Sequence, residues 1–92
     1  MSAREAFARV GLDVRCEDAG DCTMCYTKKN SEIIVITIER GKEYYAKIIP
    51  FEKIPPNPTC EAAYMTPHGL YAFAESLDDL AKRVAEKLGR LI

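Results

Sequence analysis

The stretch Glu32-Ile-Ile-Val-Ile-Thr-Ile-Glu-Arg-Gly-Lys-Glu-Tyr-Tyr-Ala-Lys-Ile-Ile49 decides the fold of this chain. It joins two runs of β-branched and aromatic residues, which favour strands, through a short polar segment that contains a glycine. Glycine supplies the positive φ that a two-residue hairpin turn requires, so we predict an antiparallel hairpin that turns at Gly41-Lys42. Pro50 ends the second strand, because proline cannot donate to a strand ladder.

The predicted register of this hairpin places apolar side chains on both faces of the sheet. Ile38 lies opposite Tyr45 in this register, and Val35 lies opposite Ile48. An antiparallel sheet with one wet face alternates more strictly between apolar and polar residues. We therefore expect a homodimer, in which a second copy of the chain covers the second face. The predicted interface consists of Ile33, Val35, Tyr44 and Ile48.

Two helices are predicted, one before and one after the strands along the chain. Ser2 and Glu5 form a capping box at the start of a short helix, which Gly11 ends. Ser76 and Asp79 form the same pattern at the start of a longer helix. Apolar residues then recur at helical spacing, and they are Leu77, Leu80, Ala81, Val84, Ala85, Leu88 and Leu91.

The rest of the chain adds shorter β elements and turns. The sequence predicts a short strand over Val14–Cys16, a strand over Thr23–Lys28, a turn at 29–31, an extended connector over 54–58, and a second hairpin of 61–66 and 70–74 around Pro67-His68-Gly69. The fold class is therefore α+β, as a single domain over residues 1–92. We expect an antiparallel β-sheet with a short N-terminal helix and a longer amphipathic C-terminal helix packed on it.

Composition narrows the classes of function. The chain has 13 basic and 14 acidic residues, and this balance argues against a general nucleic-acid binder, which shows a basic excess. No run of 18 apolar residues occurs, so no membrane span is predicted. Arg4, Glu5 and Arg9 interrupt the apolar stretch that a signal peptide needs, and we expect a cytoplasmic protein. No nucleophile elbow, metalloprotease helix or phosphate loop is present, so we expect no enzymatic activity and no catalytic residue.

The cysteines are the most informative candidate site, and they are Cys16, Cys22, Cys25 and Cys60. Glutamine is absent, and asparagine occurs only at Asn30 and Asn57. Depletion of heat-labile amides is typical of hyperthermophiles, whose intracellular proteins are rich in disulfides. We therefore predict that the four cysteines form disulfides. Three intrachain pairings and an intersubunit bridge all stay open at this point.

Metal binding through the same four cysteines is the alternative hypothesis. Cys22-Thr-Met-Cys25 is one zinc knuckle, and His68 is a possible substitute ligand. The spacing Cys16-x5-Cys22-x2-Cys25 with a distant Cys60 resembles the cluster loop of adrenodoxin-type ferredoxins, a variant of the plant-type spacing. This resemblance covers about ten residues and implies a [2Fe–2S] cluster. A redox-active pair of Cys22 and Cys25 is a further alternative.

The leading prediction of function is a non-enzymatic, disulfide-stabilised interaction protein that acts as a homodimer without a cofactor. The alternative is a structural or redox module that binds zinc or a [2Fe–2S] cluster. The chain as a whole resembles small disulfide-containing intracellular proteins of hyperthermophilic archaea, and this resemblance implies no activity. Tyr44, Tyr45, Tyr64 and Tyr71 are expected at the edge of the core rather than in a stacking surface.

Overall fold

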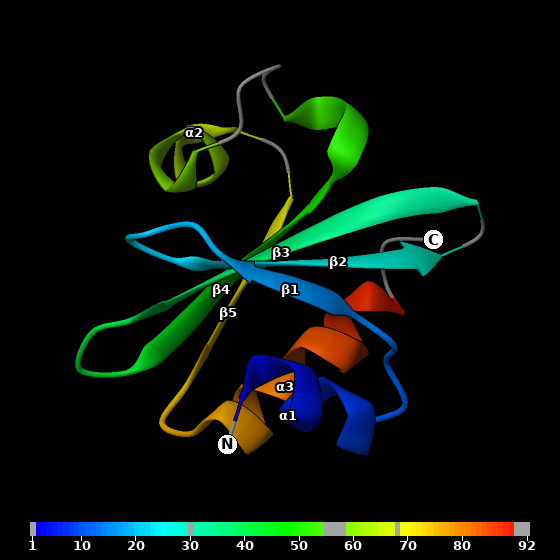
Figure 1. Cartoon of the computed structure of the whole chain (residues 1–92), viewed down its shortest axis with the longest axis vertical. Helices are drawn as coiled ribbons and strands as arrows, with labels where there is room; N and C mark the ends of the chain where they lie inside the picture. Colours follow the sequence, from blue (N-terminus) through cyan, green and yellow to red (C-terminus); the bar gives the residue numbers. More distant parts are fainter. Residues whose placement is uncertain (1, 30, 55–58, 68, 90–92) are drawn as a thin grey trace.

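The computed structural model of the chain describes residues 2–29, 31–54, 59–67 and 69–89. Its elements are α1 (Ala3–Arg9), β1 (Arg15–Asp18), β2 (Thr23–Lys29), β3 (Glu32–Arg40), β4 (Tyr44–Pro50), the 3₁₀ turn η1 (Phe51–Lys53), α2 (Cys60–Met65), β5 (Leu70–Ala74) and α3 (Leu77–Leu88). The strands form one antiparallel sheet in the order β1-β2-β3-β4-β5. The helices α1 and α3 lie on one face, and α2 lies on the other (Figure 1). The predicted α+β class is confirmed.

Both predicted capping residues begin their helices. The Ser2 hydroxyl accepts a hydrogen bond from the backbone N–H of Glu5 at 3.2 Å, and the Ser76 hydroxyl accepts one from the N–H of Asp79 at 3.2 Å. These bonds satisfy backbone donors that a helix start otherwise leaves unpaired. The prediction that the last helix reaches residue 91 extends beyond the described residues.

The register of the central hairpin differs by one residue from the prediction. Val35 lies opposite Ile49 rather than Ile48. The connection is a three-residue loop over 41–43, and its Gly41 does not adopt a positive φ. Loop length sets the register of a hairpin, so one additional loop residue moves the whole second strand by one position.

This shift exchanges the two faces of β4, because successive side chains of a strand point to opposite faces. The face covered by α1 and α3 carries Ile34, Ile36, Ile38, Ala46 and Ile48. The face covered by α2 carries Val35, Thr37, Tyr45, Lys47 and Ile49.

The predicted grouping of the interface residues on one face is therefore wrong. Ile33 and Val35 lie on the face covered by α2, whereas Tyr44 and Ile48 lie on the face covered by α1 and α3. Val35 and Ile48 are 1% and 0% exposed, so the chain itself already covers their side chains. The homodimer stays a prediction, but these four residues do not form one surface.

The second predicted hairpin is also wrong in its first half. Residues 60–65 form the helix α2, and the hydroxyl of Thr59 accepts a hydrogen bond from the N–H of Ala62 at 3.0 Å. The strand β5 pairs with β4 instead. The strand β1 begins at Arg15, one residue after the predicted start. Predictions that concern Asn30, residues 55–58 and His68 fall outside the described residues.

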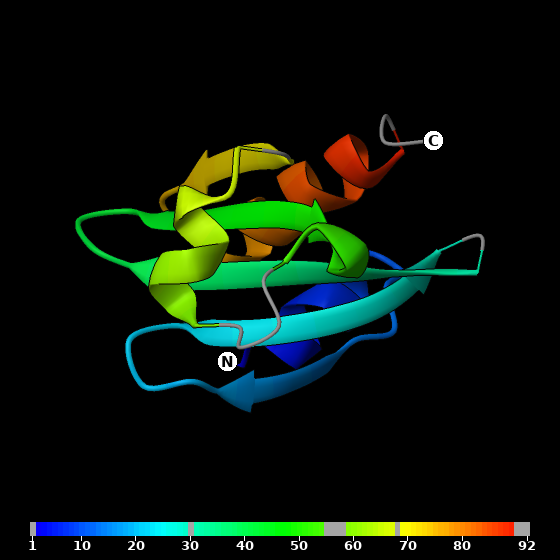
Figure 2. The same ribbon diagram turned by 90° about the horizontal axis from the view of Figure 1, so that it is seen from above.

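Two separate cores follow from this arrangement. The larger core lies between the sheet and the pair α1 and α3, and the smaller lies under α2. Figure 2 shows α2 crossing the sheet over β3 and β4. The second apolar face of the hairpin is thus covered within the chain.

Candidate functional site

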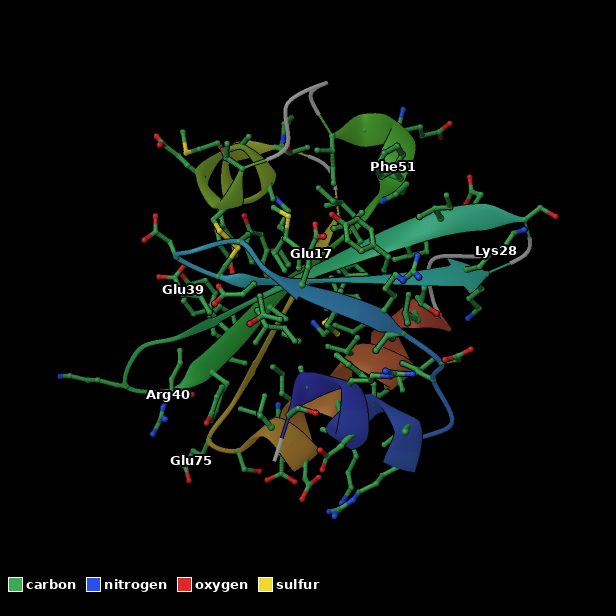
Figure 3. The ribbon with its side chains drawn as sticks, viewed as in Figure 1. Glu17, Lys28, Glu39, Arg40, Phe51 and Glu75 are labelled. Atoms are coloured by element: carbon green, nitrogen blue, oxygen red, sulfur yellow. A yellow bond between two sulfur atoms is a disulfide. The ribbon has the colours of Figure 1, made fainter. Side chains whose placement is uncertain are left out.

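The four cysteines form two disulfides within the chain. One joins Cys16 to Cys25, which lie directly opposite each other on β1 and β2 with their Cα atoms 4.0 Å apart. The other joins Cys22 to Cys60, 38 residues apart, and so links the start of β2 to the first residue of α2 (Figure 3). The prediction that all four cysteines are in disulfides is confirmed. Cys22 and Cys25 are not bonded to each other.

The two disulfides lie on opposite faces of the sheet. Cys25 belongs to the core under α1 and α3, whereas Cys22 and Cys60 belong to the core under α2. The four sulfurs are thus divided between two places, whereas a zinc or iron–sulfur site needs them together. Over the part of the chain that the structure describes, no group of three or more His, Cys, Asp and Glu side chains is placed to hold a metal ion.

A buried lysine holds the C-terminal end of α2. The side chain of Lys47 is 1% exposed, and its Nζ donates to the carbonyl oxygen of Thr66, the residue that ends α2. Nζ also lies 3.1 Å from the Tyr71 hydroxyl and 4.5 Å from the centre of the Tyr71 ring. The carbonyls at the end of a helix carry partial negative charge, which a cation stabilises. Lys47 therefore positions α2, a role that the sequence did not indicate.

An exposed cluster of rings adjoins this lysine. Tyr45 lies between Tyr64 and Phe73, with ring centres 5.1 and 6.0 Å away, and Phe73 stacks on Tyr71 at 6.5 Å. Phe73 and Tyr71 are 54% and 43% exposed, and Met65 of α2 is 76% exposed. We name this set, Tyr45, Tyr64, Met65, Tyr71 and Phe73, the aromatic surface.

The composition of the aromatic surface was only partly visible in the sequence. Tyr45, Tyr64 and Tyr71 were among the four tyrosines that we assigned to the core edge, whereas Tyr44 packs on the opposite face. Phe73 and Met65 carried no signal of their own in the sequence. The strand β5 runs with its odd-numbered residues exposed and its even-numbered residues turned to the core, and this alternation brings Tyr71 and Phe73 to the same face.

Within the aromatic surface, the Tyr64 hydroxyl is a buried polar group without a hydrogen-bond partner among the described residues. Burial raises the pKa of Tyr64 to about 12. The backbone of Tyr64 is used differently, since its carbonyl accepts a hydrogen bond from the Tyr71 hydroxyl at 3.1 Å.

The two edges of the sheet differ in chemistry. The edge strand β1 consists of Arg15, Cys16, Glu17 and Asp18, so three of its four side chains are charged. The opposite edge strand β5 reads Leu-Tyr-Ala-Phe-Ala over 70–74 and contains neither a charge nor a proline. Natural proteins protect sheet edges with charges, prolines or bulges, because an unprotected edge pairs with another strand. By this criterion β1 is protected and β5 is open to pairing.

A concave region of about 660 Å³ lies at the end of the sheet near the starts of α1 and α3. Its wall includes Cys16 and Cys22, and its rim carries charges of both signs, namely Arg4, Glu17, Asp18, Asp21 and Arg40. The mixed charge indicates no particular class of ligand.

Within the described residues, the helices are all too short and too polar to cross a bilayer. Comparisons with known protein families, with curated proteins and with solved structures find no match for this chain.

Proposed function

We propose that this protein is a non-enzymatic, disulfide-stabilised interaction protein that forms a homodimer through the free edge of β5. The observation that carries the proposal is the contrast between the charged edge β1 and the uncharged edge β5. Adding a strand to an open sheet edge is a common mode of protein recognition, and the main-chain hydrogen bonds provide affinity.

A two-fold axis at Ala72 gives the longest possible antiparallel pairing of β5 with its copy. All five residues of the strand then pair, and each side chain keeps its own face of the sheet. Tyr71 lies opposite Phe73 of the second copy. The aromatic surfaces of the two protomers thereby join into one continuous surface across the axis, and opposed aromatic side chains stabilise paired strands.

The position of α3 is compatible with such a pair. This helix packs over β4 and β5. Strands in a sheet lie about 4.8 Å apart, so α3 lies about one strand spacing from the proposed axis. Two copies of α3 would then be about 10 Å apart, which is the normal distance between packed helices. The sheet and the helix layer can therefore both continue across the dimer.

The charges of α3 also suit an antiparallel neighbour. Asp78 forms an ion pair with Arg9 of α1, at 3.4 Å, and so marks the flank of α3 that faces α1. Asp79, Arg83 and Lys87 follow one another at four-residue spacing and lie on a different flank by helix geometry. In an antiparallel pair the acidic start of one helix lies beside the basic end of the other, and these charges attract each other.

The small area that the proposed interface would bury indicates a weak dimer. Tyr71 and Phe73 each expose about half of a side chain of roughly 200 Å². With the strand edge and the flank of α3, the total falls in the class of small interfaces below about 1,200 Å². We therefore expect a dissociation constant in the micromolar range. The proposal includes a cytoplasmic location and no cofactor, supported by the amide-poor, disulfide-bonded composition.

Sedimentation equilibrium of the oxidised protein between about 5 and 500 μM tests this function. We expect reversible dimerisation, and the variant Phe73→Lys should weaken it at least tenfold because it places a charge on the open edge. The matched control is Phe51→Lys. Phe51 has a similar exposure, 48% against 54% for Phe73, and lies on the α2 side but at the other end of the sheet (Figure 3). A wild-type protein that stays monomeric, or a dimer that only Phe51→Lys disrupts, would contradict the proposal.

A further inference from the structure

The helix α2 depends on attachments at both of its ends. At its start Cys60 is bonded to Cys22, and at its end Lys47 and Tyr71 donate to the carbonyls of Thr66 and Tyr64. The helix has only six residues, and isolated helices shorter than about 12 residues are marginal in water. Apart from the backbone itself, the disulfide is the one covalent link between α2 and the sheet in the described part of the chain.

The aromatic surface is built partly on this helix. The ring of Tyr64 supports Tyr45, and the carbonyl of Tyr64 holds the Tyr71 hydroxyl. Beneath α2 lie Met24, Val35 and Ile49, which are at most 2% exposed. If α2 moves away, Tyr45 and Tyr71 lose their support, and this small apolar core opens to water.

We propose that the Cys22–Cys60 disulfide is a redox latch that controls the interaction surface. When a cellular dithiol reduces it, the start of α2 is released, the aromatic surface becomes less ordered and the dimer weakens. The inference rests on the proposed function and deepens it by naming how the same surface is regulated. A disordered side chain must be immobilised on binding, which lowers affinity. With Tyr45 and Tyr71 of both protomers affected, we expect the dimer to weaken at least tenfold.

The chemical step is a thiol–disulfide exchange. Cys22 lines the concave region at the end of the sheet and is 5% exposed, so the proposed step begins there with attack of a thiolate of the dithiol on its Sγ. The bond to Cys60 breaks, and Cys60 leaves as a thiolate that takes up a proton. The second thiol of the reductant then forms its own disulfide and releases Cys22. Two electrons and two protons pass to Cys22 and Cys60, and the dithiol is oxidised to a disulfide.

The other disulfide lacks this consequence. Cys16 lines the same cavity as Cys22, so both bonds have one cysteine beside it. Cys16 and Cys25, however, are cross-strand neighbours that the ladder between β1 and β2 already holds together. Its reduction leaves these strands in place. It therefore provides an internal control for the latch.

Hydrogen exchange of residues 60–65 and sedimentation equilibrium test the latch together. In Cys16→Ala/Cys25→Ala only the Cys22–Cys60 bond responds to dithiothreitol. We expect reduction of this variant to raise amide exchange in α2 at least tenfold, to leave the exchange of β3 and β4 unchanged, and to raise the dimer dissociation constant at least tenfold. The variant Cys22→Ala/Cys60→Ala should show the reduced behaviour at all times, and it serves as the test if the first variant does not fold.

The outcomes separate this inference from the function on which it rests. Equal exchange of α2, or an equal dissociation constant, in the oxidised and reduced states overturns the latch. A wild-type protein that is monomeric in both states overturns the proposed function, and the exchange of α2 then decides by itself whether the disulfide controls the helix.

Discussion

Removal of the Cys22–Cys60 disulfide should destabilise the protein more than removal of Cys16–Cys25. A disulfide stabilises mainly by reducing the entropy of the unfolded chain, and this effect grows with the logarithm of the loop length. The two sequence separations are 38 and 9 residues. The chain-entropy relation gives about 3.9 kcal/mol for the longer loop and about 2.6 kcal/mol for the shorter one at 25 °C. The expected difference is therefore about 1.3 kcal/mol.

Paired alanine variants make this comparison fair. Cys25 is 0% exposed, and Cys22 and Cys60 are 5% and 8% exposed, so a serine would bury a hydroxyl as well as break the bond. We compare Cys22→Ala/Cys60→Ala with Cys16→Ala/Cys25→Ala by urea and thermal unfolding without reductant, followed by circular dichroism. For a domain of this size 1 kcal/mol shifts the midpoint by about 4–8 °C, so the two midpoints should differ by about 5–10 °C.

One pattern of unfolding midpoints in the two disulfide variants would refute the loop-length argument. Equal midpoints, or a lower midpoint for the Cys16–Cys25 variant, would show that loop length does not govern these bonds. The local connection between β1 and β2 would then contribute more than the attachment of α2. Fully reduced wild-type protein provides the reference in which both contributions are absent, and it should be the least stable sample.

Three further substitutions and one control test other parts of the structure. Gly69→Ala should lower the unfolding free energy by more than about 2 kcal/mol, because Gly69 has a φ of +106° and a Cβ there would collide with the Ile49 side chain. The control Gly41→Ala should change it by less than about 0.5 kcal/mol in the same urea titration, because a Cβ there meets only the Glu43 carbonyl oxygen, at 3.9 Å. Tyr64→Phe removes a buried hydroxyl without a partner, so stability at pH 7 should be unchanged or higher. In the wild type the raised pKa of Tyr64 lowers the free energy of unfolding between pH 10 and 12, because in this range Tyr64 ionises only in the unfolded chain. The ring is half-buried, so solvent screening reduces this contribution to roughly 1 kcal/mol. Tyr64→Phe should lack the contribution of Tyr64 when unfolding curves at pH 9 and 11.5 are compared. Ser76→Ala should cost about 1 kcal/mol, seen as a lower thermal midpoint, and no change would mean that the cap on α3 contributes little.

Local signals were sufficient for the elements that begin and end through their own residues. Ser2 and Ser76 were predicted as helix caps, and both accept the expected hydrogen bonds. The strand predicted over 23–28 is β2, and β3 begins at Glu32 as expected. In each case the apolar period or the cap lies within a few residues, so the local pattern was enough.

The helix α2 shows where local patterns fail. The segment 61–66 was predicted as a strand, yet Thr59 caps a helix there. An isolated helix of six residues is not stable in water. The contacts that hold α2 in place involve Cys22, Lys47 and Tyr71, which are distant from the helix in sequence or lie outside it. The period of so short a segment cannot distinguish a strand from a helix.

The sequence by itself determined the fold class, the helix caps and the central strands, and it favoured disulfides over a metal site at the four cysteines. Those conclusions depend on composition and on neighbours in the chain. Only the tertiary structure decided the hairpin register, the disulfide pairing and the aromatic surface. A single additional residue in the loop 41–43 places Lys47 opposite Thr37 rather than Ile36, and so moves Lys47 and Tyr45 to the α2 face of the sheet. Pairing and surface depend on which elements meet in space, and that is set by the packing of both faces of the sheet together, which no single segment encodes.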